Sequence, residues 1–199
     1  CAGKIVNQCT YDISAVEISD VRSTGNYGDG ISMRGAGLSA VTVSGSDASG
    51  NGADGVFVHG KDLTDVTVDG STANDVGGTG FWLEASGGTN TSSQVLNSSV
   101  NNAGGQGVYI SGDNTVSPLV DNVTIAGTDQ GVYISTSITS TGATISNSDF
   151  SDNQNEAIYI SGATINGARI TDNSVAGKIN NFESIHLSAT TISLCPKWG

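Results

Sequence analysis

Basic residues are scarce in this chain of 199 residues. Lys and Arg together number 7 against 19 Asp and Glu, and the formal net charge is −12. Nucleic-acid-binding proteins use clusters of Lys and Arg to displace counterions, so this composition excludes a basic stripe of that kind. We therefore expect no nucleic-acid partner and no attachment to anionic membranes. The acidity suits an extracellular or cell-surface protein that is kept soluble by repulsion or that recruits cations.

Several structural signals are also missing. No apolar run is long enough for a transmembrane segment, and no signal peptide is present. No stretch shows an amphipathic helical period, and the few candidate helix caps are followed by Gly or β-branched residues. Pro occurs only 2 times, whereas Gly occurs 28 times. A composition of this kind suits either disorder or a repeat protein, and the regular spacing of the apolar residues favours a repeat.

Two short phrases recur along the chain. The stronger phrase is a small residue followed by an apolar–variable–apolar triplet, and its copies begin at Gly30, Gly55, Gly80, Gly107, Gly131, Ala157 and Ser184. The second phrase recurs at a similar but less even spacing, and it ends at Ile18, Val43, Val68, Val95, Ile125, Ile145 and Ile170. A third apolar point precedes some of these ends by five residues, at Leu38, Leu63, Val120 and Ile165. Each alternation predicts a short strand with one buried face.

Two strands and a third short segment per repeat, separated by Gly, Asn and Asp turns, are what a three-sided solenoid requires. We predict an all-β fold, a right-handed parallel β-helix of about seven coils with a repeat of roughly 25 residues and no capping helix. The chain is then a single domain over residues 1–199. Residues 1–12 form an N-terminal edge strand, 13–192 the repeats and 193–199 a C-terminal tail.

The phrases in residues 13–192 resemble the right-handed parallel β-helix superfamily, which includes pectate lyases, polygalacturonases, phage tailspikes and microbial surface proteins. The resemblance implies the fold, but not one activity, because this scaffold carries many unrelated functions.

The catalytic patterns of the enzymes in that superfamily are not recognisable here. The polygalacturonase pattern combines clustered Asp with His and an Arg–Lys pair, but His59 and His186 are far apart in the sequence. The pectate lyase pattern places an Arg or Lys base beside calcium-binding Asp residues, but Arg22, Arg34 and Arg169 are scattered. We therefore expect a surface or structural member rather than an enzyme, with no catalytic residues.

Acidic residues near turns are the remaining candidates for catalysis or metal binding. The Asp residues that could act as a pair are Asp29, Asp54, Asp75 and Asp152. Asp in a tight turn more often bonds to its own backbone. Residues 47–54 place oxygen ligands at alternating positions, as calcium loops do, but lack the terminal Glu. We expect no metal site and no cofactor, with calcium as the weaker alternative. Asn26, Asn51 and Asn153 occupy the same position in their coils. Hydrogen bonds between stacked amide side chains explain this recurrence without any ligand.

One column of residues stands out on the predicted outer surface. If the aliphatic residues of the stronger phrase point inward, its middle residue points outward. These middle residues are Ser32, Phe57, Trp82, Tyr109, Tyr133, Tyr159 and His186. The six from Phe57 to His186 form a candidate face for self-assembly or for stacking on sugar rings, and aromatic stacking that only stabilises the sheet is the third interpretation. A second outward column reads Glu17, Thr42, Thr67, Gln94, Thr124, Thr144 and Arg169.

Cysteines and sequons suggest modifications typical of secreted proteins. Seven coils at about 4.8 Å each give a rod roughly 34 Å long, so Cys195 lies too far from Cys1 and Cys9 for an internal bond. Cys1–Cys9 can form a local loop, or Cys195 can bond to Cys1 or Cys9 of a second molecule. The candidate N-glycosylation sites are Asn90, Asn97 and Asn122.

The two ends of the chain decide between the functional hypotheses. Residues 2–7 and 190–194 alternate like strands and leave no room for a capping helix. Bare coil ends that pair with copies of the same chain form an open filament. We predict an extracellular structural subunit that assembles head to tail into a filament or surface sheath, with disulfides as possible links. The alternative is a glycan-binding or polysaccharide-degrading module of a longer secreted protein.

Overall fold

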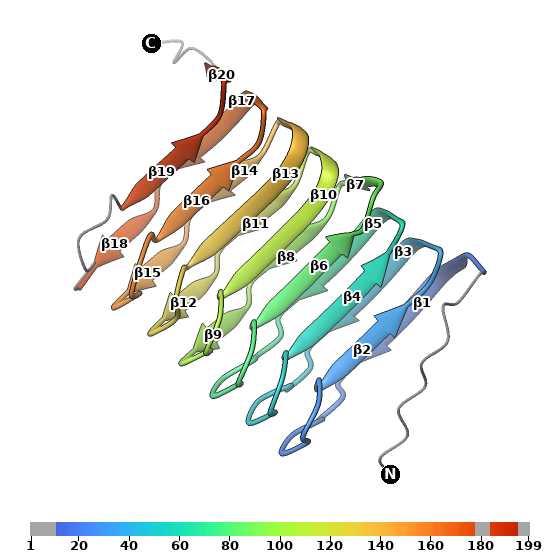
Figure 1. Cartoon of the computed structure of the whole chain (residues 1–199). Helices are drawn as coiled ribbons and strands as arrows, with labels where there is room; N and C mark the ends of the chain where they lie inside the picture. Colours follow the sequence, from blue (N-terminus) through green and yellow to red (C-terminus); the bar gives the residue numbers. More distant parts are fainter. Residues whose placement is uncertain (1–10, 178–183, 195–199) are drawn as a thin grey trace.

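The computed structural model describes residues 11–177 and 184–194. Parallel strands stack into a rod, and the first and last described strands lie at its opposite ends (Figure 1). All strand pairs are parallel, and each strand pairs with the equivalent segment of the next coil. The predicted all-β parallel solenoid is confirmed, and so is its repeat of about 25 residues, which the pairing of Val41 with Val66 illustrates.

The stronger phrase forms one continuous sheet, which we call the aromatic sheet. Its strands are β2 (Ile31–Arg34), β4 (Val56–Gly60), β6 (Phe81–Ala85), β10 (Val108–Val116), β13 (Val132–Thr141), β16 (Ile158–Ser161) and β19 (Ile185–Ser188). Equivalent residues of the phrase face each other across every pair, for example Phe57 with Trp82 and Tyr109 with Tyr133. The predicted register of the stronger phrase is confirmed for all seven copies.

Two further groups of strands complete the coils. One group follows the second phrase: β1 (Ile13–Ser19), β3 (Gly37–Ser44), β5 (Asp62–Asp69), β7 (Thr89–Thr91), β8 (Gln94–Leu96), β11 (Leu119–Asp121), β14 (Thr144–Ser146), β17 (Thr164–Thr171) and β20 (Thr191–Leu194). The other forms a separate small sheet of β9 (Ser99–Asn101), β12 (Thr124–Ala126), β15 (Asp149–Ser151) and β18 (Ser174–Ala176). Because β20 runs to Leu194, the repeats extend two residues beyond the predicted boundary at 192.

The second phrase was wrongly assigned in one coil. Val95 pairs with Val120, and Val120 pairs with Ile145, so Val120 is the true member of that column. Ile125 belongs instead to the small sheet, where it pairs with Val100 and Phe150. With Ile125 in the column, the intervals in sequence to Val95 and to Ile145 were unequal. With Val120 in its place, these two intervals are equal. In the same way, Leu119 replaces Thr124 in the second outward column.

The register error arose because both strands of this coil have the same alternation. Val120 and Ile125 are each buried, five residues apart, with a left-handed residue, Asn122, between them. Such corners recur every five residues on this side of each coil, as at Asp65, Gly70 and Asp75. Asn, Asp and Gly tolerate positive φ better than other residues, which explains their abundance at these corners.

A column of small residues allows the walls of the solenoid to approach closely. A Cβ on Gly80 would lie 2.6 Å from the Val100 side chain, and one on Gly107 would lie 2.4 Å from Ile125. Real Cβ contacts of this length do not occur, so the wall opposite the small sheet needs Gly at these positions. Core packing therefore requires the Gly that opens the stronger phrase at positions 80 and 107.

The core is mostly aliphatic but contains a polar layer in its middle coils. The column that holds Leu38, Leu63 and Ile165 continues through Asn90, Thr115 and Ser140, all buried. Asn90 donates to the carbonyls of Leu83 (3.1 Å) and Ser111 (3.2 Å), and Thr115 donates to Ser140 (3.1 Å). The Val120 predicted for this column lies elsewhere, as described above.

Residues 11–177 and 184–194 contain no helix, and so no helix that is long and apolar enough to cross a membrane. Within this described part of the chain, the prediction of a solenoid without a capping helix holds.

Candidate functional site

The predicted aromatic column runs along the outer surface of the aromatic sheet. Ring centroids of successive members are 4.7–5.5 Å apart from Phe57 to His186. Tyr133 and Tyr159 stack almost in parallel, at 6°. Since strands in a sheet are about 4.8 Å apart, the rings use their faces to contact the next rung.

This stacking changes what the column offers to a partner. Phe57 is only 6% exposed, covered by Trp82 on one side and by the Arg34 guanidinium 4.4 Å above its ring centroid on the other. The other aromatic members of the column are half-buried. Their outer rims and polar atoms are the parts left for contact. Sugar rings would therefore meet ring edges and hydroxyl groups rather than a row of open faces.

A ladder of polar side chains runs along one border of the aromatic sheet. It occupies the position just before each stronger phrase: Asp29, Asp54, Thr79, Gln106, Gln130 and Glu156. Gln106 donates to Gln130 (3.2 Å), and Gln130 donates to the buried Glu156 carboxylate (2.9 Å). The last carboxylate lies 3.8 Å from His186 Nδ1. Each of these side chains thus forms a hydrogen bond or a close charged contact with the next coil.

Two of the predicted Asp candidates meet in this ladder. The Asp54 N–H donates to Asp29 Oδ1 (3.3 Å), and Asp54 Oδ1 accepts from the Thr79 N–H (2.7 Å). Burial raises the pKa of the Asp54 carboxyl; the Thr79 hydrogen bond opposes this shift, and the Asp29 carboxylate adds to it. Asp75 and Asp152 lie instead at left-handed corners on the other side of the coil. The pair is therefore Asp29 and Asp54, and its oxygens mainly accept backbone hydrogen bonds.

Beside Tyr109 the surface is hollowed. The hollow measures about 230 Å³ and is lined by Glu84, Ala85, Ser86, Gly87, Tyr109, Ser111, Gly112, Asp113, Ser135 and Ser137. The coil is enlarged at this point. More residues separate Leu63 from its partner Asn90 than separate Asn90 from its own partner, Thr115. The two additional residues fall in the Ala85–Gly88 corner. This corner forms one border of the hollow.

The hollow combines carboxylates with hydroxyl groups. Asp113 Oδ1 accepts from Ser137 Oγ (2.7 Å), and the Asp113 N–H is held by the Gly88 carbonyl (2.9 Å). Burial raises the pKa of the Tyr109 phenol, an effect that hydrogen bonding with Ser135 partly opposes. Ser111 is 8% exposed, and although it lies beside the Tyr109 hydroxyl, its Oγ makes no hydrogen bond of normal geometry to a described residue. A buried hydroxyl without a partner is costly.

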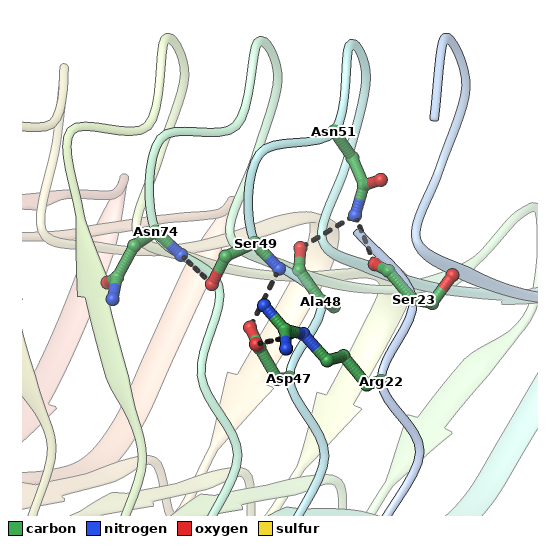
Figure 2. A network of polar contacts seen from close by, with 7 residues as sticks. All are labelled: Arg22, Ser23, Asp47, Ala48, Ser49, Asn51 and Asn74. Carbon is green, nitrogen blue, oxygen red and sulfur yellow. Dashed lines mark hydrogen bonds and ion pairs between the residues drawn. The ribbon is translucent and has the colours of Figure 1, made fainter. Parts of the chain in front are cut away.

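The acidic segment 47–54 uses its oxygens for contacts between coils, and Figure 2 shows Asp47 and Asn51 held by different partners. Asp47 faces Arg22 Nε (3.5 Å) and accepts from the Ser49 N–H (3.2 Å). Asn51 is buried and donates to the carbonyls of Ser23 and Ala48 (both 2.8 Å). Asn26 donates to Asn51 Oδ1, as the predicted stacking of amides requires. In the described residues, no three His, Cys, Asp or Glu side chains gather as a metal site would need.

The three sequons lie in different environments. Asn90 is 1% exposed and bonded to two carbonyls inside the coil, an arrangement incompatible with a glycan on the folded protein. Asn97 and Asn122 are exposed at left-handed corners, and Asn122 donates to Asn97 (2.8 Å). Glycosylation of these two stays a prediction. Cys1, Cys9 and Cys195 lie outside the described residues.

The hollow is the feature that sequence analysis missed. Its lining comes from three successive coils, so Glu84, Tyr109, Asp113 and Ser135 are not recognisable as a group in the sequence. Tyr109 alone was identified, as part of the aromatic column. The signal that could have located the hollow is the enlarged step around Gly87 and Gly88.

Comparison with known families agrees with this architecture. Residues 4–137 match the family model described as "Right handed beta helix region", which is more than half of the chain. Among curated protein sequences, none is similar enough to this chain to count as a relative. The chain belongs to the right-handed β-helix family.

Proposed function

We propose that the protein is an extracellular β-helix module that binds a carbohydrate chain on the outer surface of the aromatic sheet, with the hollow beside Tyr109 as its central subsite. The observation that carries this proposal is the combination, in one hollow, of an aromatic residue with carboxylate and hydroxyl oxygens. Such a combination suits sugars, which present hydroxyl groups around the rim of the ring and C–H groups on its faces.

The neighbouring rungs extend the site along the rod. Tyr133 and Tyr159 continue the aromatic column beyond Tyr109, and Ser161 donates to the Tyr133 hydroxyl (3.2 Å). A linear polymer that lies along the rod meets an aromatic rim and hydroxyl groups on each of these coils. We propose binding rather than catalysis, since the two hollow carboxylates, Glu84 and Asp113, are accompanied by no recognised catalytic pattern in the sequence.

The proposal is tested by a pair of matched variants. Tyr109→Phe removes the hydroxyl at the hollow but keeps the stacked ring, and Tyr27→Phe removes a fully exposed hydroxyl outside the aromatic sheet. Affinity gel electrophoresis against a panel of neutral, acidic and amino polysaccharides should show binding by the wild-type protein. Loss of one hydrogen bond should weaken binding by Tyr109→Phe about tenfold, with little change for Tyr27→Phe. Absence of binding to every polysaccharide, or equal effects of both variants, would refute the proposal.

A second function, head-to-tail assembly into a filament or sheath, is favoured by the terminal described coils. Ile185 and Ile192 are 40% and 43% exposed at one end, and Val21 is 38% exposed near the other. Each of the end strands β2 and β19 has one described neighbour in the aromatic sheet. Apolar residues and sheet edges at both ends suit the stacking of one rod on another.

Electron microscopy of concentrated protein tests assembly. Filaments should form with the wild type and be lost with Ile185→Glu, while Ile138→Glu, an equally drastic change of a 52% exposed residue in the middle of the rod, should leave them intact. Disassembly by a reductant would assign the links to Cys1, Cys9 or Cys195. Discrete single rods under all conditions would exclude this function.

A further inference from the structure

We infer that the hollow selects glycans with free, positively charged amino groups, such as β-linked glucosamine units that lack the N-acetyl group. This inference rests on the proposed function and specifies its ligand class. It is carried by the charges around Tyr109 and by the unpartnered hydroxyl of Ser111.

The lining of the hollow has negative charges but no positive one. Glu84 and Asp113 contribute carboxylates, and neither Lys nor Arg is among the lining residues. Lys61 lies one rung toward the N-terminus, at the equivalent corner, and is exposed. His59 Nε2 lies 3.9 Å from Glu84 Oε2, too far for a hydrogen bond. His59 also comes from β4, whereas the hollow extends from Glu84 toward β10 and β13.

The geometry leaves both carboxylates with capacity for a ligand. Ser137 occupies one oxygen of Asp113, and the backbone bond to Gly88 positions that residue at the corner. Glu84 and Asp113 are both partly buried, so their charges are screened less than those of fully exposed carboxylates. An ammonium group in the hollow would form a charge-assisted hydrogen bond with either carboxylate, and such bonds are about twice as strong as neutral ones.

Ser111 supplies an independent indication of a polar ligand. Its Oγ lines the hollow and is screened from water; it lies beside the Tyr109 hydroxyl but makes no hydrogen bond of normal geometry to a described residue. A sugar hydroxyl next to the amino group can satisfy it. Uronate or sulfated glycans would instead bring negative charge toward Glu84 and Asp113, in a protein of net charge −12.

Calorimetric titration with three trisaccharides tests the inference at about pH 6, where an amino group is protonated. The trisaccharides are the β-linked glucosamine form, its N-acetylated form and an acidic galacturonate form. The amino trisaccharide should bind at least about tenfold more tightly than the N-acetylated one, and the acidic one should bind least. Glu84→Gln and Asp113→Asn should each lower the affinity for the amino trisaccharide much more than the affinity for the N-acetylated one, and so remove most of the preference.

A matched control separates local recognition from overall charge. Asp149→Asn removes one exposed carboxylate from β15, outside the aromatic sheet, and should not change the preference. An equal effect of Asp149→Asn, or equally tight binding of trilysine, would overturn the inference. If the N-acetylated form binds in a Tyr109-dependent manner without any preference for amines, the inference fails and the proposed function stands. If no trisaccharide or polysaccharide binds, the proposed function itself fails.

Discussion

Replacement of Gly107 by Ala tests how the two walls of the solenoid fit together. The new Cβ would lie 2.4 Å from Ile125 Cγ2 and 2.7 Å from the Gly131 carbonyl oxygen, about 1.1 Å and about 0.8 Å closer than an ordinary contact of about 3.5 Å. Overpacking of a dense core costs about 1–3 kcal/mol, and we expect a loss of stability near the upper end of that range.

The partner of the collision makes the test specific. Ile125→Ala alone should cost about 2–5 kcal/mol, because it leaves a cavity under Gly107. In the double variant the new methyl group enters that space, so the combined loss should be smaller than the sum of the single losses by about 0.5–3 kcal/mol. The contact with the Gly131 carbonyl remains, so the recovery is partial.

Urea unfolding followed by circular dichroism measures these changes through the midpoint and the slope. Gly28→Ala is the control, since a Cβ at Gly28 meets nothing within 4 Å and its φ is not positive; it should change stability by no more than about 0.5 kcal/mol. Strict additivity of Gly107→Ala and Ile125→Ala would mean that the two residues do not face each other. That result would refute the placement of Ile125 in the small sheet and restore it to the second phrase.

Three further outcomes are expected. Asn51→Ala should destabilise the protein by about 1–3 kcal/mol in urea unfolding, because the carbonyls of Ser23 and Ala48 lose a buried donor. Asn155→Ala, which removes a bond to Asp129 alone, should cost less, and the reverse order would contradict the role of Asn51 as a buried donor. The raised pKa of Asp54 means that the folded state holds this proton to higher pH than the unfolded state, so stability falls as the pH rises through that window. Asp54→Asn should therefore raise Tm relative to wild type at neutral pH and lose this advantage in acid, whereas a gain that is independent of pH would contradict the argument. Arg34→Gln should uncover the Phe57 ring and cost about 0.5–1 kcal/mol in urea unfolding; an unchanged midpoint would show that the guanidinium contributes nothing there.

The sequence by itself determined the type of fold and one complete sheet. The period-2 alternation at each stronger phrase forces the same two residues inward in every coil, so the pairing of Phe57 with Trp82 and of Tyr109 with Tyr133 followed from spacing alone. Turn residues were equally informative, because few residue types tolerate the left-handed corners. The resemblance to β-helix proteins could therefore be recognised from the sequence alone.

The register of the shorter strands was decided only by tertiary structure. Thr124–Ile125 and Leu119–Val120 have the same alternation, Ile125 and Val120 are both buried, and each segment lies next to a turn residue. Packing distinguishes them, since Ile125 fills the space opposite Gly107 while Val120 continues the line from Val95 to Ile145. Local sequence contains no information about which residue stands across the core.

The candidate site depended on tertiary structure still more strongly. Glu84, Tyr109, Asp113 and Ser135 belong to three coils and meet only because equivalent strands of successive coils pair side by side. The aromatic column and the stacking of its rings could be predicted, but the burial of Phe57 between Trp82 and Arg34 could not, since it depends on the tilt of each ring and on a side chain outside the column. The sequence thus determined the periodic scaffold, because alternation and turn chemistry act within a few residues. The hollow and its charges were decided by contacts between coils. These contacts join residues that are far apart in the sequence, so no local pattern predicts them.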